Sequence, residues 1–231
     1  MSNTVPSQIY DALSSRSDEE KKNVLPRFFK TGKGQYGEGD KFLGVTVPNI
    51  REVAKQFKDA DFDVVKELMR SQWHEMRMCA LLILVGNSRK EVTKEVFDFY
   101  LSQTQYINNW DLVDLSAPQI VGKYLLNENR DVLYRMAESD LLWDNRISIV
   151  STLTFIRNND LDDTYNLSLK MMSHKHDLMH KAIGWMLREA GKRDAERLYN
   201  FVNEHKTNMP RTMLRYSIEK FDMETRKELM R

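Results

Sequence analysis

The sequence contains few of the residues that interrupt or cross-link helices. Only nine of its 231 residues are glycine and five are proline, which leaves little material for a flexible linker between domains. A single cysteine, Cys79, excludes an intramolecular disulfide framework and is typical of proteins in a reducing compartment. We therefore expect one cytoplasmic domain that spans residues 1–231.

Long apolar runs and an excess of one charge are also missing. No stretch reaches the roughly 18 apolar residues that a membrane helix needs, and the polar N-terminal segment has no apolar core like that of a secretory signal. The net charge is only +1, from 35 basic and 34 acidic residues. A nucleic-acid-binding role would therefore require the cations to gather on one face of the protein. A membrane partner is not expected.

Helical periodicity dominates the sequence, and the alternation typical of strands is nearly absent. The predicted helices are 6–15, 18–30, 47–57, 61–70, 74–86, 90–104, 108–126, 130–138, 141–157, 161–173, 177–191, 194–205, 209–220 and 222–230. The short loops between them indicate antiparallel pairs. Such pairs stack because one pair alone cannot bury its apolar face. The expected fold class is all-α, a curved solenoid of antiparallel helix pairs.

Residues 31–44 are the exception, because this segment holds five of the nine glycines. No strand precedes it and no GK[ST] follows, so the dinucleotide-binding and P-loop interpretations fail. A flexible surface loop between two helices is the favoured interpretation. The alternative is a mobile flap over a substrate, with Lys33, Tyr36 and Lys41 as contacts.

Equivalent positions of several predicted helices carry charged residues at intervals of roughly 30 to 37 residues, which is the period of a helical-hairpin repeat. Four are basic and one is acidic: Arg77, Arg146, Lys181, Arg211 and Asp114. A row of cations along the inner helices of a curved stack suits a rod-shaped polyanion, and duplex DNA is the natural candidate. The lone carboxylate marks one chemically distinct point in that row.

The tryptophans accompany this row in the sequence: Trp73, Trp110, Trp143 and Trp185. Trp110 lies four residues before Asp114, so the two share a helix face. Lys181, Trp185 and Arg188 likewise follow one face. Indoles beside charges are what stacking on sugars or bases while holding phosphates requires. We expect Trp73 and Trp143 to pack in the core, and Trp110 and Trp185 to serve the binding surface.

The sequence gives little support for a metal site or for nucleophilic catalysis. The HKHDLMH stretch at 174–180 places two histidines on one helix face but lacks the remaining ligands of a zinc site, so a solvated turn is favoured. Cys79 has no neighbour in the sequence that would stabilise a thiolate, and no GxSxG motif is present. We expect no metal, no cofactor and no nucleophilic catalysis.

Several motifs resemble one known family. They are NNWDLVD at 108–114, LLWDNR at 141–146, KAIGWMLRE at 181–189 and FLGVTVP at 42–48. In order and spacing they resemble the AlkD-type DNA alkylation repair glycosylases, whose fold is a curved stack of HEAT-like repeats. The similarity extends from about residue 20 to the C-terminus. The glycine-rich segment before Phe42 departs from the compact turn of that family.

The resemblance implies a monomeric glycosylase that removes cationic N3- and N7-alkylated purines from double-stranded DNA without a deep base pocket. It implies that Asp114 is the catalytic aspartate and that Trp110 and Trp185 pack on the deoxyribose. Arg146 and Arg188 would contact the DNA backbone. The charge row adds DNA-binding roles for three further residues, namely Lys181, Arg77 and Arg211.

Two other functions remain open at the level of the sequence. A non-catalytic module that binds DNA structures would use the same surface, and its DNA affinity would fall steeply with salt but would not depend on Asp114. A solenoid that binds a protein partner would instead present an apolar groove. The acid at position 114 favours the glycosylase, because neither alternative needs it.

Overall fold

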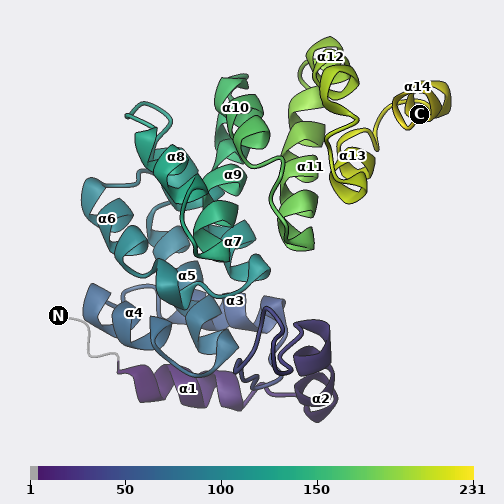
Figure 1. The fold of residues 1–231 in the computed structure, drawn as a ribbon. Coiled ribbons are helices and arrows are strands. Elements are labelled where there is room, and N and C mark those ends of the chain that lie inside the picture. The colour runs from purple at the N-terminus through teal and green to yellow at the C-terminus, as the bar shows by residue number, and fades with distance from the viewer. Residues whose placement is uncertain (1–4) are drawn as a thin grey trace. The chain divides into compact units, whose positions relative to one another are not determined.

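The computed structural model describes residues 5–231 and confirms an all-α protein (Figure 1). The chain forms two compact units, and the boundary between them falls between Ser116 and Ala117. The described residues contain no β-strand, only an isolated bridge between Lys41 and Trp73. The prediction of a single domain over the whole chain stays a prediction.

The first unit is built around helix α5, whose residues from His74 to Leu84 are buried on every side. Helices α1, α3, α4 and α7 pack against α5; Figure 1 draws this unit in colours from purple at α1 to teal at α7. A helix that is buried all round needs apolar or fully paired side chains on every face. The helices of this unit are α1 (Pro6–Ser14), α2 (Glu19–Phe28), α3 (Val47–Gln56), α4 (Phe62–Met69), α5 (His74–Asn87), α6 (Lys94–Ser102), the 3₁₀ helix η1 (Thr104–Tyr106) and α7 (Trp110–Ser116).

The second unit has two central helices, α9 and α11, which pack against each other. Gly184 lets α11 approach α13 closely, because a Cβ at this position would lie 2.5 Å from the Cβ of Tyr216. Trp143 is buried in α9, which confirms its predicted core position. The elements of this unit are the π-helix η2 (Pro118–Gly122), α8 (Asp131–Ala137), α9 (Leu142–Arg157), α10 (Asp162–Lys170), α11 (Asp177–Gly191), α12 (Ala195–His205), α13 (Arg211–Ser217) and α14 (Met223–Leu229).

The prediction of one continuous helix over 108–126 is wrong. Helix α7 ends at Ser116, and the following turn is a π-helix in which the Gly122 N–H donates to the Ala117 carbonyl at 2.9 Å. Pro118 explains the break, because it has no N–H to donate to the carbonyl of Asp114. Helix α7 is therefore a short element of seven residues, or about two turns.

Helix α9 has 16 residues, fewer than the roughly 20 that span a bilayer. Over residues 5–231, no helix combines the length and the apolar character that crossing a membrane demands.

Candidate functional site

The glycine-rich segment is anchored to α5 by a buried carboxylate. Glu75 accepts hydrogen bonds from three consecutive backbone N–H groups, those of Leu43 (2.9 Å), Gly44 (2.8 Å) and Val45 (3.1 Å). Gly44 has φ +84°, and a Cβ there would lie 2.4 Å from the Asp18 carbonyl oxygen, so only glycine fits. The end of the segment is thus held in place, whereas residues 32–35 are exposed between α2 and α3, as expected of a surface loop that joins two helices.

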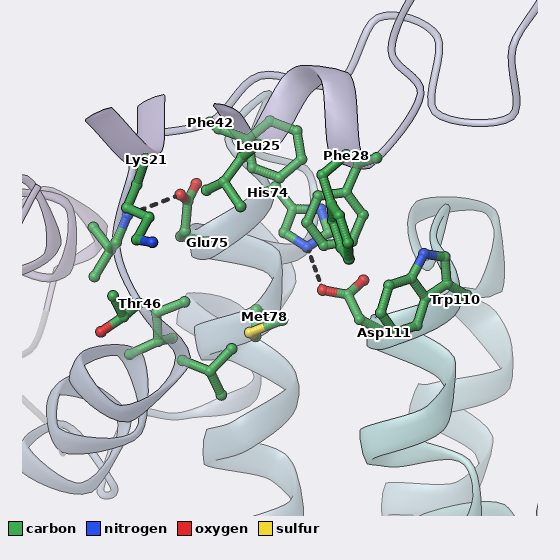
Figure 2. A pocket seen from close by; sticks show the side chains of 14 residues that line it. Lys21, Leu25, Phe28, Phe42, Thr46, His74, Glu75, Met78, Trp110 and Asp111 are labelled. Carbon is green, nitrogen blue, oxygen red and sulfur yellow. Dashed lines mark hydrogen bonds and ion pairs between the residues drawn. The ribbon is translucent and has the colours of Figure 1, made fainter. Parts of the chain in front are cut away.

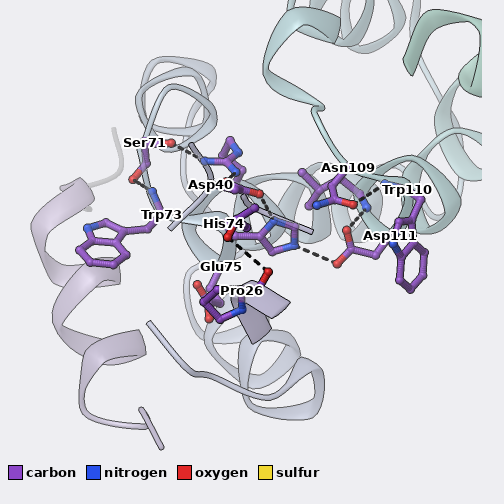
Figure 3. A network of polar contacts seen from close by, with 12 residues as sticks. Pro26, Asp40, Ser71, Trp73, His74, Glu75, Asn109, Trp110 and Asp111 are labelled. Carbon is purple, nitrogen blue, oxygen red and sulfur yellow. Dashed lines mark hydrogen bonds and ion pairs between the residues drawn. The ribbon is translucent and has the colours of Figure 1, made fainter. Parts of the chain in front are cut away.

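A second anchor is the buried imidazole of His74, which joins three elements (Figure 3). Its Nδ1 lies 2.9 Å from Asp40 Oδ2 in the glycine-rich segment, and its Nε2 lies 2.8 Å from Asp111 Oδ2 in α7. Carboxylates are acceptors, so satisfying both of them requires a proton on each ring nitrogen. We call the group formed by Asp40, His74, Arg77 and Asp111 the His74 network.

Arg77 completes this network from within the core. Its guanidinium forms an ion pair with Asp40, and its Nη1 donates to the Ser71 carbonyl at 2.6 Å. The residue is only 4% exposed. Its predicted role as a phosphate contact is therefore not supported by its position, because the helix face that carries it is covered by the segment containing Asp40. The repeat spacing places residue 77 on a face but does not reveal what lies over that face.

The charges of the His74 network follow from its geometry. Burial alone would lower the pKa of His74, but the carboxylates of Asp111 and Asp40 outweigh it and raise this pKa to about 9. Burial also opposes the charged form of Asp40, yet its contacts with His74 and Arg77 lower its pKa below the usual value. At neutral pH the imidazolium therefore ties α5, α7 and the glycine-rich segment together.

This pKa predicts how stability depends on pH. A histidine whose folded pKa exceeds its unfolded value of 6.5 stabilises the fold fully below pH 6.5 and loses that contribution as the pH rises toward 9. We expect the urea midpoint of the wild type to fall over this range and that of His74→Gln to fall much less. His174 and His176, whose pKa values are lowered, titrate below this window. Parallel pH profiles for the two proteins would contradict the assignment.

Beside the network lies a cavity of about 420 Å³ that belongs entirely to the first unit (Figure 2). Four aromatic side chains line it, together with apolar residues from α2, α3 and α5 and the polar groups of the His74 network. We call this cavity the aromatic pocket. Its lining residues are Lys21, Leu25, Phe28, Phe29, Phe42, Val45, Thr46, Val47, Ile50, His74, Glu75, Met78, Trp110 and Asp111.

Trp110 connects the aromatic pocket to the predicted catalytic residue. Its ring is stacked on that of Phe29, with centroids 5.5 Å apart, and meets the ring of Phe28 edge-on at 6.0 Å. Asp114 follows one turn later in the same helix, at about 40° from Trp110 around the helix axis. Asp114 is half-buried. The spacing thus places the indole and the carboxylate on one face of α7, and Trp110 lines the pocket.

The remaining predicted DNA contacts lie in the second unit, and several gather along α11. Lys181, Trp185 and Arg188 are half-buried on one face of this helix. Lys181 pairs with Asp177 at 2.8 Å, and Arg188 forms an ion pair with Glu219.

Two further predicted contacts come from neighbouring helices. Arg146 reaches from α9 to the start of α11, where its Nη1 donates to the Leu178 carbonyl at 2.7 Å, and it is largely buried. Arg211 is exposed at the start of α13, and its Nη1 donates to the Met230 carbonyl at 3.1 Å.

The sequence interpretation missed Asp40, His74 and Asp111. Asp111 directly follows Trp110, and Asp40 lies in the glycine-rich segment, but nothing in their spacing pairs either residue with His74. As for metals, the described part of the chain holds no cluster of three or more histidine, cysteine or acidic side chains that could bind an ion.

Comparison with known proteins gives a consistent picture. The sequence model of a family described as "DNA alkylation repair enzyme" matches residues 9–221. Among solved structures, a predicted DNA alkylation repair enzyme from Enterococcus faecalis superposes with a TM-score of 0.74 at 16% identity, covering 90% of this chain and 98% of that one. No curated protein matches the chain at a significant level.

A second solved structure comes from a family related to the HEAT-like repeat DNA glycosylases and described as having affinity for branched DNA structures. It superposes with a TM-score of 0.63 at 14% identity and covers 87% of this chain and 83% of its own. At such identities the likeness concerns the fold, and it agrees with the expected helical-repeat architecture.

Proposed function

Because the chain belongs to the family of DNA alkylation repair enzymes, we propose that it hydrolyses the N-glycosidic bond of cationic alkylated purines, such as 3-methyladenine and 7-methylguanine, in duplex DNA. The observation that carries this proposal is the half-buried carboxylate of Asp114, one helical turn from Trp110 and on the same face of α7. A carboxylate with an indole beside it would stabilise a reaction centre that becomes positively charged.

The chemistry needs no protonation of the leaving group. A purine alkylated at N3 or N7 carries a positive charge, and it leaves as a neutral base when it takes the electron pair of the glycosidic bond. The sugar then becomes cationic at C1′, and a fixed carboxylate stabilises this oxocarbenium-like state. Water adds to C1′ and releases one proton. Asp114 would orient that water, and the Trp110 ring would add attraction for the cation.

Binding DNA also requires cations that contact its phosphates. Lys181, Arg188 and Arg146 would contact the phosphates, and Trp185 on the same face as Lys181 would pack on the deoxyribose. The ion pairs of Lys181 with Asp177 and of Arg188 with Glu219 are partly exposed, so a phosphate can replace either carboxylate at little cost. We also propose that the protein acts as a monomer.

Base release tests the proposal directly. Duplex DNA treated with a methylating agent should lose 7-methylguanine and 3-methyladenine on incubation with the wild-type protein, as measured by chromatography of the released bases. The same duplex without alkylation serves as the control and should release none. Release from alkylated DNA at the rate of a protein-free sample would contradict the glycosylase function.

A second candidate is a non-catalytic protein that binds DNA structures. The observation that favours it is the fold shared with a relative described as having affinity for branched DNA. This candidate predicts tighter binding to a four-way junction than to a linear duplex of equal length, and no base release. Affinity for junctions together with base release would favour the enzyme.

A further inference from the structure

The mouth of the aromatic pocket exposes apolar side chains. Phe28, which lines the pocket, is 58% exposed, and Val47 across the mouth is 41% exposed. Large apolar side chains that cluster at the opening of a cavity indicate a binding site more than a folding requirement.

The walls of the pocket favour a flat ligand. Figure 2 shows Phe28 standing beside Trp110 on one side of the cavity and Thr46 and Lys21 on the other. The rings of Phe29 and Phe42 are stacked with 12° between their planes, and Phe29 is also stacked on Trp110. These contacts fix the orientation of the indole, so the Trp110 ring and the exposed Phe28 ring form a preformed aromatic surface.

The charged residues at the floor of the pocket, His74, Glu75 and Asp111, favour a neutral ligand. Asp111 already accepts a hydrogen bond at each oxygen, from the Leu112 N–H at 2.9 Å and from His74 at 2.8 Å. Glu75 is saturated by three backbone N–H groups. Both carboxylates are therefore already engaged with donors of the protein, and the imidazolium of His74 would repel a cationic ring.

The opposite edge offers hydrogen-bonding groups. Thr46 is the N-cap residue of α3, but its side chain makes no capping hydrogen bond with that helix. Lys21 lies at the rim and carries an ammonium group with three donors. A planar, neutral ring with acceptor atoms on its edge would satisfy these groups while its faces stack on the aromatic side chains.

We propose that the aromatic pocket binds a neutral, unpaired nucleobase of DNA. This inference depends on the DNA binding in the proposed function but concerns a different base from the lesion, because the cationic alkylpurine gains nothing from this floor. The pocket volume of about 420 Å³ accommodates a base with part of its sugar. Since Trp110 lines the pocket and Asp114 lies one turn away, a base held there would anchor the DNA strand beside the reaction centre.

The test compares two duplexes that differ by one unpaired residue. One carries a single-nucleotide bulge of 2-aminopurine, which is neutral and loses fluorescence on stacking, and the other pairs it with thymine. We expect the wild-type protein to quench the bulged base and to bind the bulged duplex more tightly. Phe28→Ala should raise the Kd for bulged DNA about tenfold, since base–aromatic stacking contributes on that scale, and leave the Kd for paired DNA unchanged.

Val24→Ala is the matched control, because it removes a similarly exposed apolar side chain from the same helix without touching the pocket. Equal affinity of the wild type for the two duplexes, or equal effects of both substitutions, would overturn the assignment. Release of 7-methylguanine together with equal affinities would reject the pocket alone. Quenching that depends on Phe28 without any base release would reject the glycosylase and support the pocket.

Discussion

Asp114→Asn is expected to lower the rate of 7-methylguanine release by about 10²–10³-fold, the usual cost of removing one well-placed electrostatic group from a reaction centre. Asparagine keeps the shape of the side chain but removes the charge that would stabilise the cationic sugar. The affinity for duplex DNA should stay the same or rise slightly, because the variant no longer repels phosphate. Single-turnover rates and Kd values measured on the same alkylated duplex separate these two effects.

Glu67→Gln provides the control for a change of charge alone, because Glu67 is an exposed acid on α4. It should release bases at the wild-type rate. An Asp114→Asn variant that keeps wild-type activity would contradict the catalytic role of Asp114. A loss of activity that only parallels a loss of DNA affinity would contradict it as well.

The second large effect concerns stability. Asp40→Asn should lower the free energy of unfolding by about 3–5 kcal/mol, the range for breaking a buried ion pair by removing one partner. The side chain of Asp40 is 1% exposed and lies between two cationic groups, His74 and Arg77. Without the carboxylate, the Arg77 guanidinium remains buried and charged with only carbonyl partners, and His74 loses one of its two acceptors.

Urea denaturation followed by tryptophan fluorescence measures this difference. Asp98→Asn is the matched control, because it makes the same substitution in an exposed ion pair, that of Asp98 with Lys94. Exposed pairs contribute little, so the control should unfold near the wild-type midpoint. If the two variants unfolded at the same urea concentration, the His74 network would not stabilise the first unit.

The two substitutions also distinguish a loss of catalysis from a loss of stability. The His74 network holds α7 through Asp111, whereas Asp114 lies one turn further along the same helix. Asp40→Asn should therefore reduce base release mainly at temperatures where the first unit begins to unfold. Asp114→Asn should reduce it at every temperature, including those far below the unfolding midpoint.

The all-α class, the paired helices and the family could be predicted from the amino-acid sequence, as could two helix faces. Trp110 and Asp114 share one of these faces, and Lys181, Trp185 and Arg188 share the other. These features follow from spacing within single helices, where 3.6 residues per turn sets the angle between side chains. The prediction of a continuous helix over 108–126 was wrong at Pro118, which has no backbone N–H to donate, although this proline is visible in the sequence.

What lies over each helix face depends on tertiary packing. Arg77 has the spacing of a surface cation, yet Asp40 of the glycine-rich segment covers it and buries the pair. His74 meets carboxylates 34 residues before it and 37 residues after it in the chain, and the aromatic pocket joins α2, α3, α5 and α7. Interactions between such distant residues depend on how whole helices pack, and helical periodicity carries no information about that packing.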